Sequence, residues 1–480
     1  MNFTKERKPG AILIIMFVLL AGGALFSTCS LSSTLDPQDV ARRAEFPVPN
    51  IIVILTDDQD YETLAYMPIL QQELIGKGVN FTNGFVTTPL CCPSRASILT
   101  GQYARNHGVL TNKTPDGGVE LFDDTSTVAI WLQEVGYKTS LIGKYMNGYE
   151  RISPYVPPGW DDWQVFADSN PPNRYYRDYD LNENGKIVHY GLEEIDYSAD
   201  VMTQKGVDFI QNSPDQPFFL FLSYYAPHQP RKSAKRHENM FQTLDDVTPF
   251  RTENFNERDV SDKPAWLQEW ERVDVSQLWD IQRQALRSLM PVDEAILELL
   301  NALELIQQQD NTVIIFLSDN GIAIGDHRLN NAKNCPYEEC IQVPFVIYYP
   351  GVVSTPREDN SLVLNIDLAP TIADIAGAPI PDMVDGMSIL PLLKDPGAAW
   401  RDDFLIEHWF LMTGLGDDNE IPDYTGIRNH EWKYVRYVTG ELELYHLSSD
   451  PYEMENLAYT EGYTDVIAVM DERLNELLEQ

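Results

Sequence analysis

Continuous apolar runs that end in polar residues predict the core of the fold. Four such runs, rich in β-branched side chains, stand at residues 50–55, 139–142, 218–223 and 312–317. Uninterrupted hydrophobicity is typical of parallel strands that are buried on both faces of a sheet. Each run is followed within a few residues by Asp, Asn, Lys or His. Because the loops at the carboxyl edge of a parallel sheet converge on one crevice, we expect a ligand site at that edge.

Helical and alternating patterns complete the predicted elements. Residues 278–309 carry apolar side chains at helical spacing and predict a crossover helix, which Pro291 is expected to kink or restart. Short alternating strands at residues 432–437 and 441–447 predict an antiparallel hairpin, and residues 464–479 predict a final helix.

The predicted fold class is α/β. A mostly parallel sheet flanked by helices is expected over residues 48–385, and a smaller C-terminal α+β domain with a short antiparallel sheet over residues 386–480. A chain of 480 residues exceeds the size at which one hydrophobic core keeps growing, which agrees with two domains. The insert at residues 154–197 is rich in Pro, Tyr, Trp and Asp and has little periodicity. We interpret it as a wall of the pocket.

The N-terminus has the pattern of a secretory leader. Basic residues precede a run of small and apolar residues from 11 to 26, which is shorter than the roughly 18 residues that a membrane-spanning helix needs. Residues 1–29 are therefore predicted to be a signal peptide and residues 30–47 a linker, which favours a secreted, periplasmic or lysosome-like location. The alternatives are an uncleaved signal anchor and a lipid anchor at Cys29.

Composition and charge exclude several classes of partner. The chain has 35 Lys and Arg against 73 Asp and Glu, a net charge of −38. Such a charge repels nucleic acids and anionic membrane surfaces, so we expect neither nucleic acid nor a stable membrane partner. An anionic substrate would need a locally basic pocket, and a long polyanion would be repelled elsewhere, which favours oligosaccharides or chain ends.

Cysteine usage does not indicate a disulfide framework. The chain has five cysteines, of which Cys29 lies in the leader. Cys335 and Cys340 are close enough in sequence to bridge in an oxidising compartment, although the separation alone leaves this open. The adjacent pair Cys91 and Cys92 has no such explanation.

Hard oxygen ligands follow two of the predicted strands. Asp57 and Asp58 come directly after the first strand, and Asp319 and Asn320 after the fourth. An acidic pair after a strand is more often a helix cap or a solvated turn, so the prediction of a metal site depends on the second pair at the same edge. Three carboxylates and one amide carbonyl suit Ca²⁺ or Mg²⁺ and do not suit zinc.

Residues 88–101, TPLCCPSRASILTG, contain the most specific motif in the chain. The form C-x-P-S-R followed by A-S-x-x-T-G resembles the signature of the type I sulfatases. In that family the first cysteine is oxidised to formylglycine (3-oxoalanine), whose hydrate attacks sulfur. The resemblance points to Cys91, because Pro93 and Arg95 stand at the required offsets from it and not from Cys92. It also implies a formylglycine-generating enzyme as a partner in maturation.

Further blocks match the same family in order from residue 50 to residue 457, so the resemblance covers nearly the whole mature chain. It implies an alkaline-phosphatase-like fold. The chain is most similar to the N-acetylglucosamine-6-sulfatase-like branch, because CCPSR, GKY, PYVPPGWDDW and HRLNNAKNCPYEE together resemble it. The other matching blocks are TDDQ at 56–59, APHQP at 226–230, SDNG at 318–321, GDH at 325–327, NIDLAPT at 365–371 and DPYEMENL at 450–457.

The resemblance implies a role for each site residue. A sulfate monoester develops negative charge on its oxygens as the S–O bond breaks, and a divalent cation with fixed cationic side chains stabilises that charge. His228 would bind sulfate or give a proton to the leaving group. Arg95 would orient the hydrate, and Lys144 and Lys333 would bind sulfate oxygens. The implied metal ligands are Asp57, Asp58, Asp319, Asn320 and the hydrate at Cys91, with Ca²⁺ expected by analogy.

One position departs from the family pattern. Many sulfatases have a histidine two places after the lysine of the GK motif, and here Met146 stands there, followed by Asn147. We expect Asn147 and His327 to contribute to substrate binding. An amide cannot act as a general base, so the proton acceptor of the reaction stays unassigned.

The expected function is hydrolysis of sulfate esters on a carbohydrate, with N-acetylglucosamine-6-sulfate units as the leading substrate. Two alternatives stay open. One is a phosphomonoester or phosphonate hydrolase of the same fold. The other is a catalytically silent glycan-binding homologue, although none of the implied ligands is replaced in this sequence.

Overall fold

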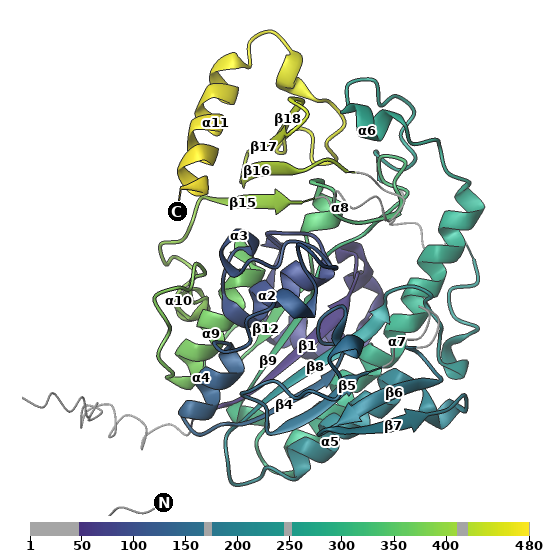
Figure 1. Cartoon of the computed structure of the whole chain (residues 1–480), viewed down its shortest axis with the longest axis vertical. Helices are drawn as coiled ribbons and strands as arrows, with labels where there is room; N and C mark the ends of the chain where they lie inside the picture. Colours follow the sequence, from purple (N-terminus) through teal and green to yellow (C-terminus); the bar gives the residue numbers. More distant parts are fainter. Residues whose placement is uncertain (1–47, 168–174, 244–251, 410–420, 480) are drawn as a thin grey trace, which may run out of the picture. The chain divides into compact units, whose positions relative to one another are not determined.

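A computed structural model describes residues 48–167, 175–243, 252–409 and 421–479. Its main feature is a ten-stranded sheet, the centre of which is parallel (Figure 1). Strands at both sides of this centre run antiparallel, so the sheet is mixed but mostly parallel, as predicted. In spatial order the strands are β13 (Arg357–Asp359), β2 (Val79–Phe81), β12 (Phe345–Tyr348), β9 (Thr312–Ser318), β1 (Asn50–Asp57), β8 (Phe218–Pro227), β4 (Lys138–Gly143), β5 (Asp162–Phe166), β6 (Tyr179–Glu183) and β7 (Lys186–Tyr190).

Helices cover both faces of the sheet, which explains the continuous hydrophobicity of the central strands. In β1, Ile51 and Val53 point into one core, and Ile52 and Ile54 point into the other, because successive side chains alternate between faces. The first core also contains side chains of α2 (Cys91–Thr100), α4 (Val128–Glu134) and α9 (Leu368–Ala376), and the second contains those of α5 (Ser198–Gln211) and α7 (Val275–Leu305).

The crossover helix α7 corrects one expectation. It runs without interruption through Pro291, so the predicted restart is wrong. Apolar side chains before and after the proline, such as Leu289 and Ile296, are buried in the same core. This burial on both sides holds the helix together although Pro291 lacks an N–H.

The insert at residues 154–197 forms strands that its sequence pattern did not predict, and its interpretation as a wall of the pocket stays a prediction. It contains β5, β6 and β7, which extend the main sheet at one edge. Tyr179 on β6 stacks on Tyr190 on β7, with ring centroids 5.2 Å apart, and such cross-strand aromatic pairs stabilise a sheet without a strict apolar pattern.

A second sheet lies in the C-terminal part of the chain. Four antiparallel strands follow in sequence order, and α11 (Thr464–Leu478) packs on them (Figure 1). The predicted hairpin is present as β17 and β18. The strands are β15 (Asp403–His408), β16 (Tyr424–Asn429), β17 (Trp432–Tyr437) and β18 (Leu442–His446).

The sequence predicted a signal peptide, a linker and two domains. Contacts group residues Val48–Gln480 into one compact unit, and the predicted domain boundary at residue 386 stays a prediction. The predicted signal peptide (1–29) and linker (30–47) lie outside the described residues. Within the described residues, no helix has the length and apolarity that a membrane span requires.

Candidate active site

The ends of the central strands bring the predicted site residues to one place. Asp57 ends β1, and Asp58 follows it. Lys144 follows β4 directly, and His228 follows β8. The parallel arrangement of these strands gathers their carboxyl ends at one edge, as the sequence predicts. The site also receives Asp319 and Asn320 after β9, Cys91 and Arg95 from α2, and Lys333 after the short strand β11 (Asn330–Ala332).

The four predicted oxygen ligands are buried, and hydrogen bonds join three of them, Asp58, Asp319 and Asn320. Asp57, Asp319 and Asn320 are fully buried, and Asp58 is 4% exposed. The Asn320 amide Nδ2 donates to Asp58 Oδ1 at 2.7 Å, and the Asp58 backbone N–H donates to Asp319 Oδ1 at 3.1 Å. The Asn320 Oδ1 atom is buried with no hydrogen-bond partner. A buried acceptor without a donor, next to carboxylates, fits a site for a hard cation.

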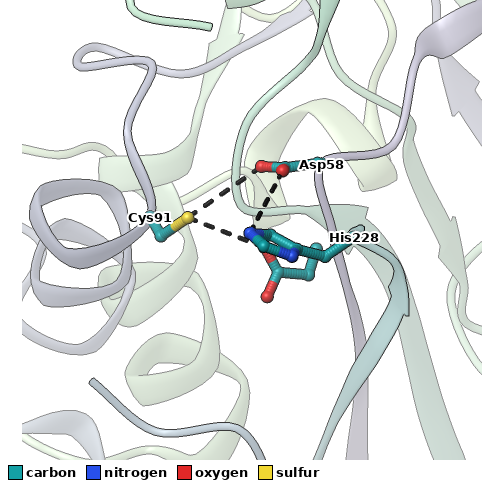
Figure 2. Close-up of side chains that lie close together, drawn as sticks. Asp58, Cys91 and His228 are labelled. Atoms are coloured by element: carbon teal, nitrogen blue, oxygen red, sulfur yellow. Dashed lines mark hydrogen bonds and ion pairs between the residues drawn. The ribbon is translucent and has the colours of Figure 1, made fainter. Parts of the chain in front are cut away.

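Cys91 lies at the first position of α2, in contact with this cluster. Its Sγ is 3.6 Å from Asp57 Oδ1, 3.9 Å from Asp58 Oδ1 and 2.9 Å from Lys333 Nζ. In Figure 2 the side chains of Cys91, Asp58 and His228 point toward one another. Burial raises the pKa of the Cys91 thiol to about 12, so the unmodified thiol is protonated near pH 7 and is a weak nucleophile.

Each buried carboxylate has a cationic partner. Lys144 Nζ pairs with Asp57, Lys333 Nζ lies 2.9 Å from Asp58 Oδ1, and Arg95 Nε lies 2.8 Å from Asp319 Oδ2.

The carboxylates keep both lysines charged. Burial by itself lowers the pKa of each lysine, but the neighbouring carboxylates outweigh it, so the pKa values of Lys144 and Lys333 are raised. Burial by itself raises the pKa of Asp58, but the charge of Lys333 and of other cations holds it well below its usual range. The site is therefore a charged network with fixed positive groups around Cys91.

Arg95 is held from several sides. Its Nη1 donates to the Ser223 Oγ at 2.7 Å and to the Lys144 carbonyl oxygen at 2.9 Å. Ser223 lies on β8 and was not singled out in the sequence, although it is the last residue of the predicted strand 218–223. These bonds tie α2 to Ser223 within β8 and to Lys144, the residue that follows β4.

His228 lies at the open side of the cluster. Its Nδ1 is 2.8 Å from the Gln229 carbonyl oxygen and must carry a proton to donate to it, which leaves the Nε2 lone pair facing Asp58 Oδ2 at 3.5 Å. Burial lowers the pKa of His228 to about 3, so the ring is neutral near pH 7. Tyr225 supports the ring, with centroids 4.7 Å apart, and its position on β8 was not recognised from the sequence.

Comparison with known proteins agrees with this arrangement. A family model described as "Sulfatase" matches residues 49–378. The chain belongs to the sulfatase family. A second model, described as N-sulphoglucosamine sulphohydrolase, C-terminal, matches residues 325–480. The N-acetylglucosamine-6-sulfatase of Homo sapiens is 35% identical over 460 residues, which cover 86% of this chain and 81% of that protein.

Other sulfatase relatives are longer than this chain. The extracellular sulfatase SULF-1 homolog of Drosophila melanogaster is 36% identical over 375 residues, but the chain spans only 33% of its length. The chain spans 52% of the length of a Sulf-1 homolog from Caenorhabditis elegans.

Solved structures share the fold. A protein in complex with D-glucosamine-2-N,6-O-disulfate superposes with a TM-score of 0.78 and 24% identity, covering 90% of this chain and 97% of that one. A phosphonate monoester hydrolase from Agrobacterium radiobacter superposes with a TM-score of 0.69 and 21% identity, covering 90% and 96% of the two chains. The predicted alkaline-phosphatase-like α/β fold of the sulfatase family is therefore confirmed.

Of the two residues predicted to contribute to substrate binding beside the catalytic groups, His327 makes its contacts away from the Cys91 cluster. His327 is fully buried, with Nδ1 2.7 Å from Glu257 Oε2 and Nε2 3.1 Å from the Asn254 amide Nδ2. Both ring nitrogens are thus engaged away from the site. The Asn147 backbone carbonyl oxygen accepts from the Val119 N–H at 2.9 Å. The Asn147 Oδ1 atom is buried and has no hydrogen-bond partner among the described residues, and the role of Asn147 in substrate binding stays a prediction.

The other described cysteines are a disulfide pair and the buried thiol of Cys92. Cys335 and Cys340 form a disulfide, which the sequence left open. It lies just after Lys333 in the chain and ties Cys335 to α8 (Glu338–Ile341). Cys92 is free and buried, with Sγ 3.7 Å from the Met146 sulfur, and its backbone N–H donates to Asn112 Oδ1 at 2.8 Å.

Proposed function

We propose that the protein hydrolyses sulfate esters on carbohydrates, with Cys91 oxidised to formylglycine as the nucleophile. The observation that carries this proposal is the position of Cys91, at the start of α2, within 4 Å of two buried carboxylates and 2.9 Å from the ammonium of Lys333. A negatively charged sulfate above Cys91 would meet a fixed cation, and the nucleophile would face its sulfur. The family to which the chain belongs supports this reaction class.

A divalent cation completes the proposed site. Asp57, Asp58, Asp319 and Asn320 would hold it, and the unpartnered Oδ1 of Asn320 supports this set. Oxygen ligands suit Ca²⁺, which we propose, and also admit Mg²⁺. When bound, the cation would stabilise negative charge on the sulfate and on the oxidised Cys91 side chain.

The other side chains of the site would bind the sulfate, orient the nucleophile and protonate the leaving group. Lys144 and Lys333 bind sulfate oxygens, because both ammonium groups lie at the cluster and stay charged. Arg95, which is held between Asp319 and Ser223, orients the oxidised Cys91 side chain. His228, whose Nε2 faces the cluster beside Asp58, would bind the sulfate or, in its protonated form, give a proton to the departing sugar oxygen.

The proposed substrate is a sulfated glycan or oligosaccharide, with N-acetylglucosamine-6-sulfate as the leading unit. The relatives named N-acetylglucosamine-6-sulfatase support this choice. The net charge of −38 favours oligosaccharides or chain ends. Secretion through the N-terminal signal is proposed as well, supported by the extracellular relative, with a formylglycine-generating enzyme acting during maturation.

The nucleophile is tested by fragmenting the tryptic peptide of residues 78–95 in a mass spectrometer. The protein is taken from its native source or co-expressed with a formylglycine-generating enzyme. We expect an aldehyde at Cys91 and an intact thiol at Cys92. Two unmodified thiols in native protein would contradict the mechanism and favour the silent glycan-binding protein.

Turnover separates the remaining alternatives. Cys91→Ala should abolish hydrolysis of a sulfated aryl ester, and Cys92→Ala, a change at the neighbouring buried thiol, is the matched control and should retain it. A higher activity on phosphate or phosphonate esters than on sulfate esters would instead indicate the phosphohydrolase alternative.

A further inference from the structure

The proposed site has one more buried cation than the three that pair with its carboxylates. The three buried carboxylates Asp57, Asp58 and Asp319 are matched by Lys144, Lys333 and Arg95, each within ion-pairing distance of one of them. A fourth cation, Arg231, stands three residues after His228 on the same turn, and its backbone N–H donates to the His228 carbonyl oxygen at 3.2 Å.

Arg231 is buried between the two loops that deliver His228 and Lys333. Its side chain is only 5% exposed. Its Nη2 donates to the Asn331 Oδ1, and Asn331 precedes Lys333 by two residues. Arg231 has φ 54° and Asn331 has φ 59°, which is left-handed backbone that residues with a Cβ rarely adopt. Such backbone persists where the surrounding structure enforces it, often at functional sites.

The guanidinium of Arg231 has no carboxylate partner. Among the ion pairs of the described residues none includes Arg231, and its Nε is buried without an acceptor. Burial lowers the pKa of Arg231, and the charge of Asp58 offsets this only in part, although a guanidinium stays protonated. A buried charge without a partner is costly, so a fixed cation of this kind is best explained by an anion that arrives with a ligand.

We propose that Arg231 binds a second anionic group of the substrate, a sulfate or a carboxylate next to the scissile sulfate ester. This inference rests on the proposed function. The guanidinium binds anionic oxygens with directed N–H donors, and its buried Nε–H is a donor that no acceptor of the described residues satisfies. Arg231 is thus a specificity residue that favours substrates with two or more negative charges.

A purely structural role makes a different prediction. If Arg231 only ties Asn331 to the His228 loop, its loss disturbs every substrate by the same factor. If it binds a second anion, its loss affects doubly charged substrates most. The ratio of kcat/KM between two substrates that differ only in the second anion separates these roles, because any common damage cancels in the ratio.

The experiment compares four sulfate esters with the formylglycine-containing enzyme. These are 4-nitrophenyl sulfate, N-acetyl-D-glucosamine 6-sulfate, D-glucosamine N,6-disulfate and a disaccharide in which 6-sulfated N-acetylglucosamine is linked to a uronic acid. Wild type should favour one or both of the last two over the monosulfate. Arg231→Gln should lower that preference at least tenfold, and the substrate on which it falls identifies the second anion as sulfate or carboxylate.

Two further variants sharpen the test. Lys232→Gln removes one positive charge from the exposed neighbouring position and should leave the preference unchanged. Asn331→Asp places a carboxylate next to the guanidinium and should lower the preference without removing Arg231, which keeps the test valid if Arg231→Gln does not fold.

Two outcomes would overturn the inference. An equal loss on all four esters in Arg231→Gln, with an unchanged preference in Asn331→Asp, would assign Arg231 a structural role only. Wild-type enzyme that cleaves 4-nitrophenyl sulfate without preferring any doubly charged substrate would also refute it, and would leave the proposed sulfatase function intact. Absence of activity on every ester would refute the proposed function as well.

Discussion

Replacing Lys333 by methionine removes the cation closest to the proposed nucleophile. The ammonium lies 2.9 Å from Cys91 Sγ and 2.9 Å from Asp58 Oδ1, and the side chain is only 20% exposed. Methionine has a similar length and keeps the apolar stem, so the change mainly deletes the charge and its hydrogen bonds.

The magnitude follows from the burial of this contact. Removing one preorganised donor that stabilises developing charge costs about 10²–10³-fold in rate, or roughly 3–4 kcal/mol. Asp58 would also lose its closest cation, and breaking a buried ion pair destabilises proteins by about 3–5 kcal/mol. We therefore expect both a loss of kcat/KM by a factor of roughly 10²–10³ and a lower free energy of unfolding.

The assay measures kcat/KM with 4-nitrophenyl sulfate, corrected for the formylglycine content and the folded fraction of each preparation. Lys263→Met is the matched control. Lys263 is more deeply buried than Lys333, with Nζ 3.1 Å from Asp262 Oδ2 and 2.8 Å from the Glu453 carbonyl oxygen, but it lies outside the site. This control should lose stability and keep its kcat/KM per folded, modified molecule. A loss of less than threefold in Lys333→Met would refute the role assigned to Lys333.

Two other predictions concern the proposed metal and the buried His408. Dialysis against a chelator should lower both the activity and the thermal unfolding midpoint. Ca²⁺ should restore both better than Mg²⁺ does. An unchanged midpoint would argue against a metal held by Asp57, Asp58, Asp319 and Asn320. Burial lowers the pKa of His408 to about 4, so between this value and about 6.5 the unfolded chain binds more protons and stability falls as pH falls. In His408→Asn the slope of unfolding free energy against pH, from denaturant titrations at pH 4.5 to 6, should decrease by up to one proton, about 1.4 kcal/mol per pH unit; an identical slope would contradict the assignment.

The pattern of residues predicted the main strands well because their environment is simple. Residues 50–55 and 312–317 are buried on both faces of the sheet. A strand buried on both faces needs apolar side chains at successive positions, so its sequence is a continuous apolar run. The insert at residues 154–197 lacked this signal because β7 is the edge strand of the sheet and none of its residues is buried, while β5 and β6 are only partly buried. An edge strand needs no strict pattern, so its pairing could be seen only in the structure.

For the site, the sequence located most of the residues that converge. Asp57, Asp319 and Lys144 follow parallel strands, and the ends of parallel strands meet at one edge. Motif membership was a weaker guide for His327, because a motif does not tell in which direction a side chain points. Ser223 and Tyr225 were missed, since a serine and a tyrosine in a buried strand carry no signal of a charged neighbour in another loop.

The sequence by itself determined the fold class, the family resemblance and the residue types that gather at the carboxyl edge of the sheet. These follow from local periodicity and from motifs of a few adjacent residues. Only the tertiary structure decided which charges pair. Arg95 bonds to Asp319, more than two hundred residues away, while Arg231 is left without a carboxylate. Local patterns record whether a side chain is buried, but the partner of a buried charge depends on how distant loops meet in space.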